Sequence, residues 1–228
     1  ATSTKLYQRL FDPAITKELR IYALEGNDSL IVSGDNSSIK IRLIGGPGED
    51  GFTNNTGGKR IKVYDASFEK NTFTGDGLDI KNVSDPEVNR YNYSSFKYNY
   101  IHPRVEAGYN KDDGFTVALT LEYFRQGFRK EPYGMRQYLH AERYFGTGSY
   151  RFRYESDYVK VVKDYDVNIR ADIMGPVNIT NFFGLGNNIM FDKAKGINYY
   201  RTRYEMGNIS LLFGKQLQSW MRVGFGPA

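Results

Sequence analysis

The feature that most limits how this chain can fold is a strict two-residue alternation along its C-terminal half. Residues 149–162 read SYRFRYESDYVKVV, with aromatic side chains at Tyr150, Phe152, Tyr154 and Tyr158. The residues between them are charged, namely Arg151, Arg153, Glu155 and Asp157. Because successive side chains of a β-strand point to opposite faces, this spacing predicts a strand with one aromatic face and one charged face.

The same alternation recurs in other stretches of this half. Residues 114–125 (GFTVALTLEYFR) alternate apolar side chains with a more polar set, and residues 166–174 (DVNIRADIM) place Arg170 and Asp172 opposite apolar residues. Residues 200–213 and 220–225 continue the pattern. Counting such segments after residue 98 predicts an antiparallel sheet of about seven to eight strands.

Aromatic content indicates which kind of sheet this is. The 228 residues include 19 Tyr, 15 Phe and one Trp, or 15% of the chain. A soluble β-sandwich also alternates, but its buried face is mostly aliphatic. An aromatic face opposite a charged one is typical of an outer-membrane β-barrel with a lipid-facing exterior and a wet lumen. We therefore expect an incomplete all-β transmembrane barrel, with a soluble all-β fold as the alternative. The expected lumen charges are Arg151, Arg153, Glu155, Asp157, Arg170 and Asp172.

Turn lengths and aromatic anchors support the same interpretation. Short turns are predicted at residues 111–113, 146–148 and 163–165, and longer joins at 127–134 and 176–197. Short turns on one side and long loops on the other are typical of outer-membrane barrels. Aromatic residues near strand ends are expected at the membrane–water interface. These are Tyr109, Phe145, Phe182, Phe183 and Trp220.

The N-terminal part has a different character. Strands are predicted at residues 19–24, 29–32, 39–44 and 61–64, separated by turns rich in Gly and Asp. The turns 24–28 and 45–50 (GGPGED) resemble the calcium-binding nonapeptide repeat of β-roll proteins. This resemblance gives Asp28 and Asp50 as candidate Ca²⁺ ligands, with a turn that holds no ion as the alternative. The expected organisation is a small β-rich periplasmic segment (1–68), a linker or irregular cap (69–97) and the first part of the barrel (98–228).

Several functional classes are excluded or disfavoured by composition. The chain has no cysteine and only two histidines, His102 and His140, so thiolate sites and multi-histidine metal centres are not expected. A net charge of +5 is too small an excess to indicate nucleic-acid binding. No apolar run is long enough for a transmembrane helix, and no secretory signal is visible. We expect no catalytic residue and no cofactor in this segment, apart from the calcium considered above.

Three short stretches resemble one known family. They are GYNKDDGF (108–115), GFRKEPY (127–133) and NFFGLGN (181–187). They are similar to the C-terminal region of Bacteroidota outer-membrane proteins in which a calcineurin-like metallophosphoesterase domain precedes a BamA-like, surface-antigen-type barrel. Residues 18–52 resemble the segment just before that barrel, and NFFGLGN also resembles barrels attached to patatin-like phospholipases. The metal-binding signatures of the phosphoesterase have no match in this sequence, and the expected strands are too few for a complete barrel.

The resemblance implies a function and a location. The segment is expected in the outer membrane of a Gram-negative bacterium, embedded in the lipid bilayer, as anchor and scaffold for an upstream metallophosphoesterase domain. A BamA-like barrel that assembles or exports outer-membrane proteins within an envelope complex is the alternative. A third hypothesis is a soluble calcium-binding β-roll module that docks to a surface.

Overall fold

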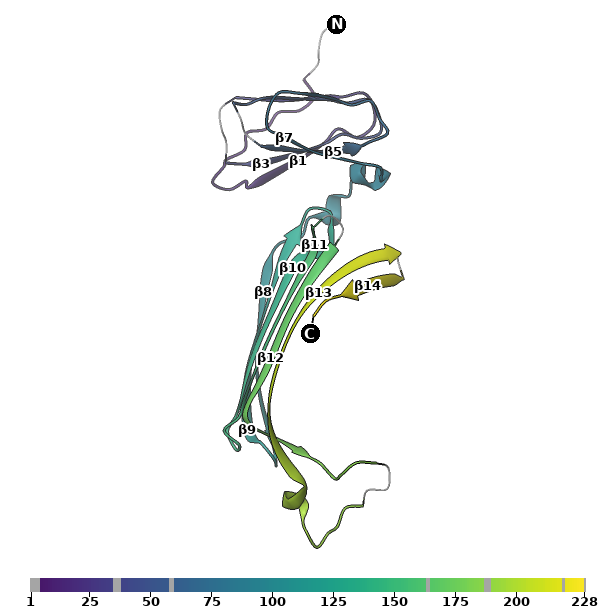
Figure 1. Cartoon of the computed structure of the whole chain (residues 1–228). Helices are drawn as coiled ribbons and strands as arrows, with labels where there is room; N and C mark the ends of the chain where they lie inside the picture. The colour runs from purple at the N-terminus through teal and green to yellow at the C-terminus, as the bar shows by residue number, and fades with distance from the viewer. Residues whose placement is uncertain are drawn as a thin grey trace. The chain divides into compact units, whose positions relative to one another are not determined.

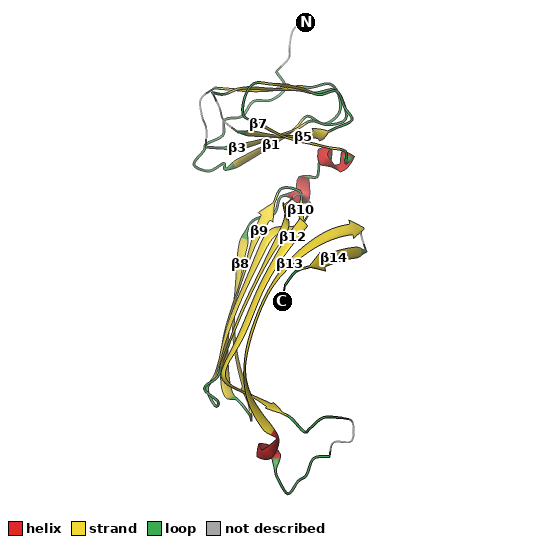
Figure 2. Ribbon diagram, viewed as in Figure 1, coloured by secondary structure: helices red, strands yellow, loops and turns green. Residues whose placement is uncertain are grey.

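The computed structural model describes residues 5–34, 38–57, 60–162, 165–186, 190–218 and 220–227. In these residues the chain is all-β, and helix is confined to the short 3-10 turns η1 (Pro86–Asn89), η2 (Tyr93–Ser95) and η3 (Ile197–Tyr200) (Figure 2). The chain divides into two compact units, Ala1–Ser95 and Phe96–Ala228.

The first unit is a parallel coil with two sheets. One sheet holds β1 (Glu18–Tyr22), β3 (Lys40–Ile44), β5 (Ile61–Ala66) and β7 (Leu78–Val83), and the other holds β2 (Ser29–Ser33), β4 (Gly51–Asn55) and β6 (Thr72–Thr74). Every pairing is parallel (Figure 1). Successive strands alternate between the sheets, so each coil adds one strand to both sheets.

Apolar side chains from both sheets form the core of this unit. Phe52 is fully buried and stacks on Phe73 of the next coil, with ring centroids 5.5 Å apart. The remaining buried members of the cluster are Leu30, Leu43, Ile61 and Val63. Along β5, Lys62 is less buried than Ile61 and Val63 on either side of it, as the two-residue period of a strand requires. On β3, Arg42 and Ile44 are buried together with Leu43.

Four of the strands in this unit were predictable from sequence, and three were not. The segments expected at 19–24, 29–32, 39–44 and 61–64 correspond to β1, β2, β3 and β5. The strands β4, β6 and β7 were missed because GFTNN, TFT and LDIKNV are short or polar. The structure thus differs from the linker or cap expected over residues 69–97, since β6, β7 and η1 lie there and the unit boundary follows Ser95.

The second unit is a seven-stranded antiparallel sheet whose strands are neighbours in chain order. Figure 1 shows these strands as a long, curved sheet. The strands are β8 (Tyr100–Asn110), β9 (Gly114–Gly127), β10 (Lys130–Tyr144), β11 (Tyr150–Val162), β12 (Tyr165–Asn181), β13 (Arg201–Gln218) and β14 (Met221–Phe225). The sheet does not close on itself, and β8 and β14 form its two edges.

One connection differs from the sequence prediction. The long join expected over 127–134 is a turn of only two residues, Phe128 and Arg129, with Arg129 at φ 56°. The residues after the turn continue as β10, and the pairing shifts register between Lys130 and Met135. A β-bulge adds residues to a strand without ending it, so the Gly and Pro of this stretch gave the appearance of a loop.

The other connections do not divide into short turns at one end and long joins at the other, because the short turn at 111–113 lies at the same end of the sheet as the long connection at 182–200. The turn at 111–113 joins β8 to β9, and a long connection at 182–200 joins β12 to β13. At the opposite end of the sheet, β11 ends at Val162 and β12 begins at Tyr165, while β13 ends at Gln218 and β14 begins at Met221. The predicted turn residues 163–164, and Asn187 of the NFFGLGN stretch, lie outside the described residues.

Candidate functional site: a charged face on the seven-stranded sheet

The charged side chains predicted from sequence gather on one face of the sheet. The register pairs Arg153 with His140 on one side and with Asp172 on the other, so all three residues share a face. The same pairing extends to β8 and β9, where Arg104 lies opposite Thr120. We call this the charged face. Its main members are Arg104, Glu106, Glu122, Arg136, His140, Glu142, Arg151, Arg153, Glu155, Asp157, Asp166, Arg170 and Asp172.

Arg136 is the centre of the largest ion cluster on this face. Its Nη2 atom lies 2.6 Å from Glu122 Oε1 on β9, while Nη1 lies 3.5 Å from Glu155 Oε2 and 3.4 Å from Asp157 Oδ2 on β11. The four side chains are each about a quarter exposed. One guanidinium therefore connects three strands, as a planar group with five donors can.

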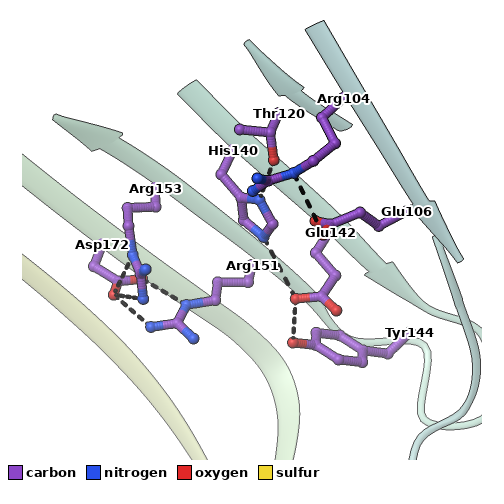
Figure 3. A network of polar contacts seen from close by, with 9 residues as sticks. All are labelled: Arg104, Glu106, Thr120, His140, Glu142, Tyr144, Arg151, Arg153 and Asp172. Carbon is purple, nitrogen blue, oxygen red and sulfur yellow. Dashed lines mark hydrogen bonds and ion pairs between the residues drawn. The ribbon is translucent and has the colours of Figure 1, made fainter. Parts of the chain in front are cut away.

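A second cluster joins β11 to β12. Arg151 donates two hydrogen bonds to Asp172, of 3.0 Å from Nε to Oδ1 and 2.7 Å from Nη2 to Oδ2. Arg153 donates to the same carboxylate from Nη2, at 3.2 Å. Figure 3 shows both guanidinium groups pointing toward Asp172. The bidentate contact fixes the carboxylate, because two parallel bonds restrict its rotation.

His140 lies in a third group, between β9 and its own strand. Its Nδ1 is 2.9 Å from Thr120 Oγ1, and its Nε2 is 3.6 Å from Glu142 Oε2 (Figure 3). Tyr144 donates to Glu142 at 2.6 Å. The register places Tyr138, His140 and Glu142 on the same side of β10. Each polar group here has a partner on a neighbouring residue, as in a structural network.

The opposite face of the sheet is apolar and exposed. Ile209 is 70% exposed, Val105 is 72% exposed and Leu119 is 45% exposed. Each of the three lies well inside its strand, away from the strand ends. Other large side chains on this face are exposed as well. They include Ile101, Phe115, Leu121, Tyr150, Phe152, Ile173, Val223 and Phe225. We call this the apolar face.

The aromatic residues predicted at the interface lie at the two ends of the sheet. Tyr109, Phe145, Phe182 and Phe183 lie at the end that carries the connections 111–113, 145–149 and 182–200. Phe145 packs against Phe115 there, with ring centroids 5.9 Å apart. Trp220, 76% exposed, lies at the opposite end.

The structure brings some of the predicted lumen charges together and adds others. Arg151, Arg153 and Asp172 form one cluster, while Glu155 and Asp157 contact Arg136. Arg170 faces Glu155 across the β11–β12 pair and is exposed. Sequence reasoning missed Arg136 and Glu122, although the register of an antiparallel hairpin would have aligned them once the short turn at 128–129 was recognised.

The two candidate calcium ligands of the first unit lie in successive coils. The Asp28 N–H donates to Asp50 Oδ1 at 2.8 Å, and the Asp50 N–H donates to Asn71 Oδ1 at 2.8 Å. The Gly/Asp turns are therefore stacked, and side-chain oxygens bridge one coil to the next. In the described part of the chain, no three His, Asp or Glu side chains form a metal-binding group.

Comparisons with known proteins give no relative. No family model, no curated protein and no solved structure matches this chain. Within the described ranges, no helix has the length and apolar character needed to cross a membrane.

Proposed function

We propose that the second unit is part of a transmembrane β-barrel in a bacterial outer membrane. The observation that carries the proposal is the exposure of the apolar face along strands whose other face is ion-paired. Apolar surface of this extent marks a protein or membrane contact in a folded protein. A barrel accounts for both faces, because its apolar exterior contacts lipid and its polar lumen contacts water.

Strand length supports a membrane-spanning role. The strands β9 to β13 have 13 to 18 residues each. A tilted transmembrane strand needs only about 9–11 residues to cross the hydrocarbon core. Each of these strands is long enough to span the bilayer and extend beyond it at one or both ends.

The aromatic residues at the strand ends support the same orientation across a membrane. Tyr109 and Phe145 lie at one end of the sheet and Trp220 lies at the other. Two belts of aromatic side chains at the two interfaces are typical of outer-membrane barrels. In this arrangement the connection 182–200 belongs to the cell-exterior side, where such loops are longer.

The proposal requires partners for both edges of the sheet. An open strand edge in lipid leaves backbone N–H and C=O groups without hydrogen bonds. The strands β8 and β14 must therefore pair with further strands to close the barrel. In this proposal the lipid bilayer surrounds the closed barrel, and other envelope proteins are candidate partners in a complex.

The role within the cell rests on the family resemblance of the sequence. On that basis the barrel anchors a metallophosphoesterase domain at the membrane, and the segment itself performs no catalysis. The ion clusters of the charged face agree with a scaffold, because Arg136 and Asp172 are each held by neighbouring strands.

Membrane extraction tests the proposal. Isolated outer membranes are washed with 1 M salt and then with alkaline carbonate, and the chain is followed by immunoblotting and by the intact mass of the detergent-extracted polypeptide. We expect it to remain in the pellet and to be released only by detergent. Release by carbonate would contradict a membrane-spanning role. The intact mass then tells whether further strands and domains come from the same polypeptide.

A further inference from the structure

Two buried carboxylates face each other at a corner of the parallel coil. Asp50 is 2% exposed and Asp65 is 1% exposed. Both lie beside Gly45: a Cβ atom on this glycine would be 2.4 Å from Asp50 Oδ2 and 2.3 Å from Asp65 Oδ2. The two Oδ2 atoms are therefore no farther apart than the sum of those distances. Both oxygen atoms therefore pack against the backbone of Gly45, where a larger residue would displace them.

One oxygen of each carboxylate, Oδ2, has no hydrogen-bond donor. Asp50 Oδ1 accepts from Asp28 N, and Asp65 Oδ1 accepts from Ala66 N and from Asn89 Nδ2, each at 2.8 Å. The Oδ2 atoms of both aspartates are buried and receive no hydrogen bond from an N–H or O–H donor, and the same holds for Glu69 Oε2 and Asn89 Oδ1. The carboxyl groups of Asp65 and Glu69 lie against each other at this corner. A buried polar atom without a partner costs free energy. Several such oxygens together indicate that a binding partner for them is missing.

The groups next to Asp50 and Asp65 are also acidic, so negative charge accumulates at this corner. Burial raises the pKa of Asp50, and the negative charges of Asp28 and Glu69 act in the same direction. Burial also raises the pKa of Asp65 to about 6, with Glu69 and Asp50 adding to the effect against hydrogen bonds from Asn89 and Ala66.

Other carboxylates in the same unit are arranged differently. Glu18 contacts Arg20 at 2.7 Å and Arg42 at 3.0 Å, and Asp79 contacts Lys62 and Lys81. In those two cases, arginine and lysine hydrogen bonds lower the pKa of the carboxyl groups. The corner at Gly45 is thus a place where the fold gathers negative charge and leaves oxygen lone pairs directed at one another.

We propose that this corner binds one calcium ion between Asp50 and Asp65. Two carboxylates supply the charge, and Asn89 Oδ1 is a neutral oxygen close to Asp65. Water completes the shell, since Ca²⁺ accepts six to eight oxygen ligands in flexible geometry. This pair differs from the Asp28–Asp50 pair of the sequence prediction, and Asp28 contributes its backbone N–H to Asp50 instead.

Calorimetry on the full chain in detergent micelles tests the site. The protein is stripped with EGTA and titrated with CaCl₂, as wild type, Asp50→Asn, Asp65→Asn and the control Glu49→Gln. Glu49 is an exposed acid on the same turn, so its variant removes one charge without touching the corner. We expect one calcium per chain for wild type and control, and at least a tenfold weaker Kd for both aspartate variants.

The variants are chosen so that folding does not confuse the result. Asparagine keeps Oδ1, so Asp50→Asn still accepts the hydrogen bond from Asp28 N. Circular dichroism verifies the fold of each variant. Calcium binding that is equal in all four proteins would overturn the proposal. Absence of calcium binding to the wild type would overturn it as well. An infrared band of a protonated carboxyl that Asp65→Asn removes would then show that a proton occupies the corner.

Discussion

Arg136 Nη2 on β10 lies 2.6 Å from Glu122 Oε1 on β9, and the same guanidinium reaches two carboxylates on β11. This arrangement ties three strands together on the charged face. Glu122, Glu155 and Asp157 share this one guanidinium, and Asp157 also accepts hydrogen bonds from Tyr133 and Asn168. The cluster is partly buried, so the loss of that cation has a cost that an exposed ion pair would not have.

We therefore expect Arg136→Met to destabilise the sheet by about 1–3 kcal/mol, since partly buried acceptors lose their charged donor. The measurement is urea unfolding of the full chain in detergent micelles. Arg104→Met is the matched control. Its ion pair with Glu106 is 3.4 Å long and half-exposed, so its loss should cost at most about 1 kcal/mol. Equal effects of the two variants would contradict a structural role for the cluster.

A second prediction concerns the core of the parallel coil. Phe52 is fully buried and stacks on Phe73, so Phe52→Ala should destabilise this unit by about 3–5 kcal/mol. Limited proteolysis followed by mass spectrometry would then find new cleavage within residues 18–83. Ile31→Ala, on an exposed position of β2, should leave the pattern unchanged. Cleavage of the control at the same rate would show that the coil is not held by this core.

The pH dependence of the coil follows from Asp65. Its pKa is raised to about 6 from a reference value of 3.8, chiefly by burial. The folded state therefore binds this proton more tightly than the unfolded state does. In EGTA, the free energy of unfolding should fall as the pH rises from about 4 through about 6, because the proton is lost on the way.

Thermal unfolding between pH 4 and 7, followed by circular dichroism, measures this dependence. Asp65→Asn should flatten it, while Glu49→Gln should keep it. If Asp65→Asn retained the full pH dependence, another group would be responsible. With saturating Ca²⁺ the trend should reverse, since the cation competes with the proton for the same oxygen atoms.

How far the sequence could predict the fold depends on the range of the interactions. The alternation of Arg151, Phe152 and Arg153 assigns faces directly, because the strand period is a local property. The placement of Asp50 and Asp65 beside Gly45 depends on the length of each coil, which local sequence patterns do not reveal. The turn at Phe128 and Arg129 is not evident from sequence, because the irregular pairing that follows it interrupts the two-residue alternation. Long-range register is therefore the part that local patterns leave open.

A fourth prediction compares two neighbours on β13. Asn208 lies opposite Asp172 on the charged face, and Ile209 lies opposite Ala171 on the apolar face. In a bilayer, Ile209→Arg should cost about 2–4 kcal/mol, because an arginine would face lipid near the membrane centre. Asn208→Arg should be tolerated beside Asp172. The fraction of each variant recovered in the outer-membrane pellet is the readout, and equal recovery would contradict the assignment of the faces.

The central claim is that the apolar face contacts lipid, and spin-label accessibility tests it most directly. The chain has no cysteine, so single cysteines can be introduced at each position from 206 to 213 and labelled without background. In lipid bilayers, collisions with oxygen should peak at Ile209 and Leu211. Collisions with a water-soluble nickel complex should peak at Asn208 and Ser210. Accessibility to the nickel complex that is equal on both faces, or highest at Ile209, would contradict the membrane-barrel account.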